Sequence, residues 1–244
     1  MEIKTYTKNE HPSNCMVVVG GSGDSINKFS QFLEKLSKTL DDYVICMFDF
    51  TRSDNESILD AQSRELTSVF KDLINKNKFE KIDIFCTSMG AYATVKILSN
   101  SKYSKVIKKV IFFDPADYYI LQKLHQNENN TWSGHQTYYP SSKVISDELR
   151  NIPSNIKVDV VHLTIHNYSS SGYFTKNLTE RNIDQNNGFP RLSTKMVKAF
   201  YEKLPNKNKG KYLEISNLPH GFIRDGNIEE NIKKVVSVVN KLLN

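Results

Sequence analysis

The sequence has little glycine and little cysteine for its length, with 10 glycines and 3 cysteines in 244 residues. Cys15, Cys46 and Cys86 form no Cys-x-x-Cys pair, and each lies in an apolar run typical of a strand. A small, odd and dispersed set of this kind excludes a disulfide-rich secreted scaffold, so we expect reduced, buried thiols in a cytoplasmic protein. Metal-ligand spacings are also missing, and no metal is expected.

Long hydrophobic runs are absent as well. Residues 1–14 are polar and contain no apolar run of signal-peptide length, which argues against secretion by that route. The longest apolar runs, residues 15–19 and 43–48, are much shorter than the ~20 residues that a membrane-spanning helix needs. We therefore expect no membrane association.

What is present is the composition of an ordinary globular protein. The apolar fraction is 39% and the charged fraction 25%, which excludes a disordered or collagen-like chain. The net charge of +6 arises from 27 lysines and 6 arginines against 27 acidic residues. These lysines are spread along the chain and are not gathered with aromatic residues on one element. The charge therefore indicates a solvated surface, and no nucleic-acid partner is expected.

Apolar periodicity predicts strands that alternate with helices. Runs typical of strands cover residues 3–7, 15–19, 43–48, 82–86, 110–113, 158–165 and 211–215. Helical spacing covers residues 25–40, 56–76, 91–98, 192–204 and 228–243. This order predicts the α/β class, with a mostly parallel sheet and helices on both faces. Residues 118–156 are less regular, and we interpret them as a small lid insertion within a single domain, 1–244.

The strongest chemical signal is the segment around Ser88. The run 82–86 leads into a turn of small residues that carries Ser88, and a helical pattern begins at once. A nucleophilic serine needs this context, because a tight strand-to-helix turn projects its hydroxyl from the end of a sheet, beside the positive end of the helix dipole. The alternative is that Ser88 only caps the helix.

Residues 86–90, Cys-Thr-Ser-Met-Gly, resemble the Gly-x-Ser-x-Gly motif of the α/β-hydrolases, with cysteine in place of the first glycine. The resemblance implies the α/β-hydrolase fold with a sheet of about seven strands. It also implies a serine hydrolase that cleaves a small-molecule ester or thioester through an acyl-enzyme on Ser88, without a cofactor. Residues 48–57 resemble the family's Asp-x-Arg-Gly-x-Gly-x-Ser segment with its glycines lost.

The cluster Gly20, Gly21 and Gly23 supports this resemblance, because the family places a glycine-rich turn after an early strand. Backbone amides near that turn and after the nucleophile stabilise the oxyanion of the tetrahedral intermediate. The resemblance implies the N–H groups of Ser22 and Met89 as these donors.

The resemblance further implies a histidine base after the last strand. His220 lies in Leu-Pro-His-Gly-Phe, between the run 211–215 and the C-terminal helix, and matches the family's His-Gly-Phe. The acid usually follows the penultimate strand, but residues 166–172 contain no carboxylate. Asp184, which precedes Pro190 and the helix 192–204, is the first choice. Some lipases of this fold place the acid one strand earlier, so Asp114 is the alternative, followed by Asp117 and Glu180.

Other interpretations stay open. The glycine cluster, the following helix and a strand ending at Asp49 also resemble an NAD(P)-binding unit of an oxidoreductase, although Ile26 stands where its third glycine belongs. The altered motif and the missing acid would also suit a catalytically silent α/β-hydrolase-fold protein that binds a ligand. In the predicted lid, Trp132 and Tyr138 are candidate substrate-binding residues, or they pack the insertion onto the sheet. The sequence identifies neither the substrate nor the oligomeric state.

Overall fold

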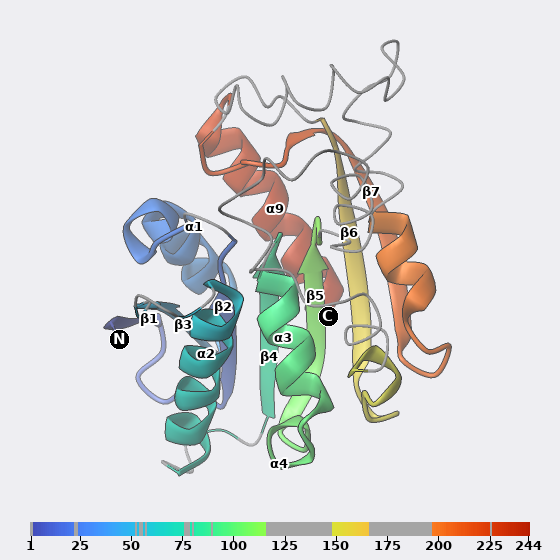
Figure 1. Cartoon of the computed structure of the whole chain (residues 1–244). Helices are drawn as coiled ribbons and strands as arrows, with labels where there is room; N and C mark the ends of the chain where they lie inside the picture. Colours follow the sequence, from blue (N-terminus) through green and yellow to red (C-terminus); the bar gives the residue numbers. More distant parts are fainter. Residues whose placement is uncertain are drawn as a thin grey trace.

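Figure 1 shows the computed structural model of the chain. The structure describes residues 2–21, 24–51, 53, 56, 58–75, 79, 81–88, 90–115, 148–165, 197–224 and 226–244. Within these ranges, strands and helices alternate in the order that the apolar periodicity predicts.

A single seven-stranded sheet forms the centre of the molecule (Figure 1). Its strands are β1 (Glu2–Tyr6), β2 (Asn14–Val19), β3 (Tyr43–Asp49), β4 (Lys81–Thr87), β5 (Ile107–Phe113), β6 (Lys157–Ile165) and β7 (Lys209–Pro219). Their order is β1-β3-β2-β4-β5-β6-β7, and all neighbours are parallel except the edge pair β1 and β3. The carboxyl ends of β2 to β7 therefore meet at one edge of the sheet, where ligands bind in such folds.

Helices cover both faces of this sheet (Figure 1). One face carries α2 (Ile58–Asn75), α3 (Gly90–Ser99), α4 (Ser101–Ser104) and the helical residues 197–203. The other carries α1 (Ile26–Thr39) and α9 (Ile228–Leu243). Along β2, Val17 and Val19 join the first core and Met16 and Val18 the second. All four are fully buried, which explains why this strand is a continuous apolar run.

The two helices on the second face show how the sequence specifies their ends. The side chain of Ser25 caps α1 by accepting a hydrogen bond from the backbone N–H of Lys28 at 3.4 Å. Asn227 caps α9 by accepting from the backbone N–H of Glu230 at 3.3 Å. Apolar residues at spacings of three and four turn one stripe of each helix toward the sheet. The predicted helices 25–40 and 228–243 are confirmed.

Only the end of the predicted insertion 118–156 falls in the described part of the chain. Leu149, Ile152 and Ile156 are fully buried in the core beneath α2 and α3. These residues therefore belong to the body of the domain, whereas residues 118–147 lie outside the described ranges.

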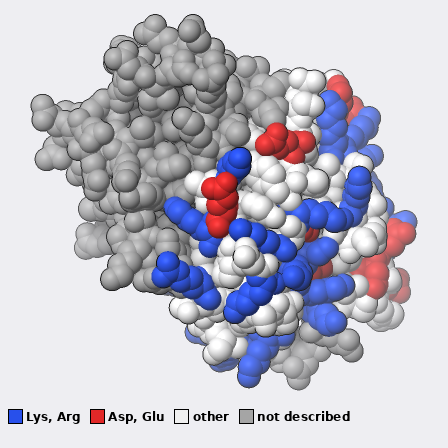
Figure 2. Space-filling model, turned by 90° about the vertical axis from the view of Figure 1, so that its right-hand side faces the viewer, with Lys and Arg blue, Asp and Glu red and all other residues white. Residues whose placement is uncertain are grey.

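Positive side chains are spread over one face of the molecule. Figure 2 shows this face, at the β7 edge, where Lys and Arg side chains cover the described surface with fewer acidic side chains among them. Lys209 and Lys211 belong to β7, which forms one edge of the sheet. Lysines on an edge strand oppose pairing with a strand of another chain, which gives these charges a structural role. None of the helices in the described ranges is both long and apolar enough to cross a membrane.

Candidate active site

Ser88 forms the turn between β4 and α3. Its φ is 46°, a left-handed conformation that costs a non-glycine residue about 1–3 kcal/mol. Its backbone N–H donates to the Phe113 carbonyl of β5 at 3.1 Å, which ties the turn to the neighbouring strand. A helix-capping residue has an extended backbone, and α3 begins only at Gly90, so Ser88 does not have the conformation of a cap. The geometry is that of the strained turn that carries a nucleophile.

Gly90 allows α3 to begin directly against the end of β2. A methyl group on Gly90 would lie 2.6 Å from the Val19 carbonyl oxygen and 2.8 Å from that of Gly20. Gly21 also lies close to the serine turn, because a Cβ on Gly21 would be 3.0 Å from the Cβ of Ser88. The glycine-rich turn after β2 and the turn at Ser88 are therefore in contact, as an oxyanion hole between them requires.

The close approach of Gly90 to the end of β2 predicts that Gly90→Ala lowers the stability of the protein. The added methyl group meets backbone carbonyls that cannot rotate away, so we expect the free energy of unfolding to fall by about 1–3 kcal/mol. Chemical denaturation followed by circular dichroism measures the change. The exposed Ser101→Ala variant of α4 is the control and should stay within about 0.5 kcal/mol of the wild type. Equal stability of the two variants would contradict the close packing at Gly90.

Asp24 connects the glycine-rich turn to β4. Its Oδ2 atom accepts a hydrogen bond from the Gly21 N–H at 2.6 Å and lies 3.4 Å from the Thr87 hydroxyl. Its Oδ1 atom lies 3.9 Å from the guanidinium of Arg224, in the turn that follows β7. Because the Gly21 N–H is bonded to Asp24, it is not directed at an oxyanion. The predicted donors, Ser22 and Met89, lie outside the described residues.

His220 and Asp114 meet at the carboxyl ends of β7 and β5. The Nδ1 atom of His220 lies 2.5 Å from the Oδ2 atom of Asp114. The Asp114 side chain is only 3% exposed and that of His220 is 19% exposed, so the pair is largely shielded from water. Such shielding strengthens a charge-assisted hydrogen bond. The structure thus brings the predicted base together with the alternative acid.

The remaining predicted site residues fall outside the described part of the chain. These are the first-choice acid Asp184, the further acids Asp117 and Glu180, and the candidate substrate-binding residues Trp132 and Tyr138. Their assignments stay predictions.

His162 is the site residue that sequence reasoning missed. It lies in β6, is fully buried, and places its Nδ1 atom 2.9 Å from the Oδ1 atom of Asp114. The backbone N–H of Leu163 donates to the same oxygen at 3.3 Å. The signal in the sequence is a histidine flanked by Val161 and Leu163 in a run typical of a buried strand, since a buried polar side chain needs a partner.

Cys86 occupies the place of the motif's first glycine, two residues before Ser88. Its thiol is fully buried, its Sγ atom lies 3.7 Å from the Ile111 carbonyl oxygen, and burial raises its pKa. A raised pKa keeps the thiol protonated, and a protonated thiol is a poor nucleophile. Cys86 is therefore a packing residue, and Ser88 is the candidate nucleophile of this turn.

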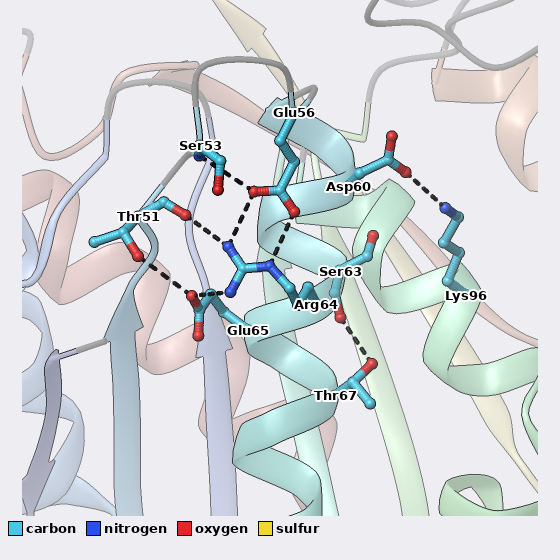
Figure 3. Close-up of polar contacts among 9 residues, drawn as sticks. All are labelled: Thr51, Ser53, Glu56, Asp60, Ser63, Arg64, Glu65, Thr67 and Lys96. Carbon is cyan, nitrogen blue, oxygen red and sulfur yellow. Dashed lines mark hydrogen bonds and ion pairs between the residues drawn. The ribbon is translucent and has the colours of Figure 1, made fainter.

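The loop after β3 is held by Arg64 of α2 (Figure 3). Arg64 donates to the Thr51 carbonyl at 2.8 Å and to the two carboxylate oxygens of Glu56 at 2.9 and 3.0 Å. It also lies 2.5 Å from Glu65. Thr51 and Glu56 belong to the segment 48–57, and hydrogen bonds from Arg64 hold these two residues in place. In the described ranges, no three His, Cys, Asp or Glu side chains are grouped to hold a metal ion.

Solved structures match this fold, whereas no family model and no curated protein matches the sequence. An esterase from Pyrococcus furiosus has a TM-score of 0.59 at 14% identity, covering 95% of this chain and 82% of that one. A monoacylglycerol lipase from Paleococcus ferrophilus has a TM-score of 0.58 at 13% identity, covering 98% of both chains. Esterase 2 from Thermogutta terrifontis has a TM-score of 0.65 at 12% identity, covering 99% and 88%.

The chain therefore has the α/β-hydrolase fold, as the sequence predicts. The alternative of a dinucleotide-binding fold is wrong. Numbered in chain order, the parallel strands β2 to β7 lie in the order 2-1-3-4-5-6, whereas a dinucleotide-binding sheet has the order 3-2-1-4-5-6. Gly21 of the glycine cluster that suggested it packs against Ser88.

Proposed function

We propose that the protein is a serine hydrolase that cleaves a carboxylic ester or thioester of a small molecule. The proposal rests above all on the contact between His220 and Asp114. The strained turn at Ser88 is adjacent to Asp114, because the Ser88 N–H donates to the carbonyl of Phe113, the residue before Asp114. The esterases and the lipase among the similar structures support the same class of reaction.

In the proposed reaction, the Oγ atom of Ser88 attacks the carbonyl carbon while Nε2 of His220 accepts the hydroxyl proton. Asp114 holds the proton on Nδ1, which leaves Nε2 as the basic nitrogen and stabilises the imidazolium that forms. The tetrahedral intermediate then expels the alcohol or thiol, which takes the proton from His220. Water then attacks the carbonyl carbon of the acyl-enzyme while His220 accepts a proton from it. The second tetrahedral intermediate releases the carboxylic acid product, and the Oγ atom of Ser88 takes the proton back from His220. Backbone N–H groups of Ser22 and Met89 are the proposed oxyanion donors.

Asp114 is the proposed acid, in place of Asp184, which the sequence ranks first. The Asp114 carboxylate is within hydrogen-bond distance of Nδ1 of His220, and an ionised carboxylate in this contact accepts the proton of that nitrogen. Its burial excludes water that would compete for this proton. An acid at the end of β5 also needs no residue from 166–196.

Labelling with a fluorophosphonate tests the proposed function. Such a probe phosphonylates a serine only where a base and an oxyanion hole activate it. We expect the folded wild type to be labelled stoichiometrically, with the added mass on the peptide that contains Ser88. Heat-denatured protein, in which the site is dispersed, should not react. A folded wild type that resists the probe would instead indicate a catalytically silent binding protein.

A further inference from the structure

We propose that His162 is a positioning residue that fixes the Asp114 carboxylate so that one of its oxygens faces His220; its catalytic consequence rests on the proposed function. In the described site, the Asp114 carboxylate lies between two histidines. His220 is the proposed base, and His162 has no part in the reaction steps given above.

The two oxygens of Asp114 are divided between two strands. Oδ1 faces β6, where it lies 2.9 Å from Nδ1 of His162 and accepts from the Leu163 N–H at 3.3 Å. Oδ2 faces the end of β7, 2.5 Å from Nδ1 of His220. The Asp114 backbone N–H donates to the Val161 carbonyl at 2.7 Å. β6 therefore anchors both the backbone of Asp114 and one of its oxygens.

This anchoring matters because nothing intrinsic to aspartate fixes the plane of its carboxylate. The terminal torsion of the side chain is broad, so rotamer preference alone leaves the plane free to turn. Asp114 also sits in a left-handed turn, with φ of 50°, at the end of β5. A rotation of the carboxylate would carry Oδ2 away from His220 and leave the imidazole without its fixed tautomer.

His162 is suited to prevent that rotation. Its side chain is fully buried in a sheet strand, so the ring has no room to follow a moving carboxylate. An ionised carboxylate only accepts hydrogen bonds, so His162 must carry a proton on Nδ1 to bond with it. A charged oxygen buried at this depth also needs donors to offset its lost hydration.

A matched pair of variants, His162→Asn and His162→Gln, separates positioning from simple packing. The amide nitrogen of asparagine is bonded to Cγ, as Nδ1 is, and can still donate to Asp114. The amide of glutamine lies one bond further out, so it buries the same group without reaching Oδ1. We expect His162→Asn to keep kcat on a short p-nitrophenyl ester within about threefold of wild type. His162→Gln should lower kcat about 10- to 100-fold with KM unchanged.

Equal kcat values for the two variants, at equal melting temperatures, would overturn the positioning role. A second measurement needs neither variant nor activity. Nitrogen-15 NMR of histidine-labelled wild type should show protonated Nδ1 atoms on both His162 and His220. An unprotonated Nδ1 on His162 would overturn the inference directly. An inactive wild type that shows both protonated Nδ1 atoms would contradict the proposed hydrolase and leave the positioning of His220 supported.

Discussion

Replacing Ser88 with alanine is expected to lower kcat on a short p-nitrophenyl ester by roughly 10⁶-fold, because no other group supplies the attacking oxygen. Alanine and serine tolerate the left-handed backbone at this position about equally, since both have only a Cβ near the chain. The variant should therefore fold with nearly unchanged stability. Rates from stopped assays at high enzyme concentration, with the free energy of unfolding measured in parallel, check both statements.

The exposed Ser101→Ala variant serves as the matched control for this experiment, since it removes a hydroxyl that α3 separates from the turn at Ser88. It should retain the wild-type rate. If a stable Ser88→Ala variant keeps more than a small fraction of the activity, Ser88 is not the nucleophile. Fluorophosphonate labelling that survives in the variant would likewise exclude Ser88 and direct attention to another serine.

Asp114→Asn is expected to lower kcat by about 10⁴-fold, although the new side chain has the same shape. The amide oxygen can still accept from His162 and Leu163, so the amide nitrogen turns toward His220. It then donates to Nδ1, which forces the imidazole proton onto Nε2 and removes the basic nitrogen that Ser88 needs. The loss should fall on kcat, with little change in the melting temperature.

Asp184→Asn decides between the two acids. In the proposed site this variant keeps a rate close to wild type, because Asp184 is not the partner of His220. A severe loss in Asp184→Asn, together with a mild loss in Asp114→Asn, would restore Asp184 as the acid of first choice. Comparable losses in both would show that each carboxylate is needed, one of them for a reason other than the tautomer of His220.

Local sequence patterns predict the fold because the strands and helices have the apolar spacing typical of their type. Strands β2 to β6 contribute apolar side chains to two cores, and α1 and α9 each carry one apolar stripe. Ser88 can be proposed as the nucleophile from the sequence because a nucleophile turn constrains both its neighbours and the flanking elements. His220 can be proposed as the base because its place in the chain follows from the order of strands.

The proposed acid, Asp114, and the proposed positioning residue, His162, could not be predicted with equal ease. Asp184 ranks first in the sequence because it precedes a helix at the family's usual place in the chain. The contact of Asp114 with His220 instead depends on the distance between the ends of β5 and β7, two strands that β6 separates. His162 escapes prediction for the same reason. Periodicity places it in a strand, but only the packed sheet shows which buried carboxylate it meets.

The position of Asp114 at the end of β5 has a consequence for how such a protein can diversify. The three proposed reactive side chains follow β4, β5 and β7, so the framework itself carries the chemistry. Residues 116–147 and 166–196 supply none of them. In the proposed enzyme, a change of sequence in either segment would therefore leave all three reactive side chains in place at the ends of the sheet strands.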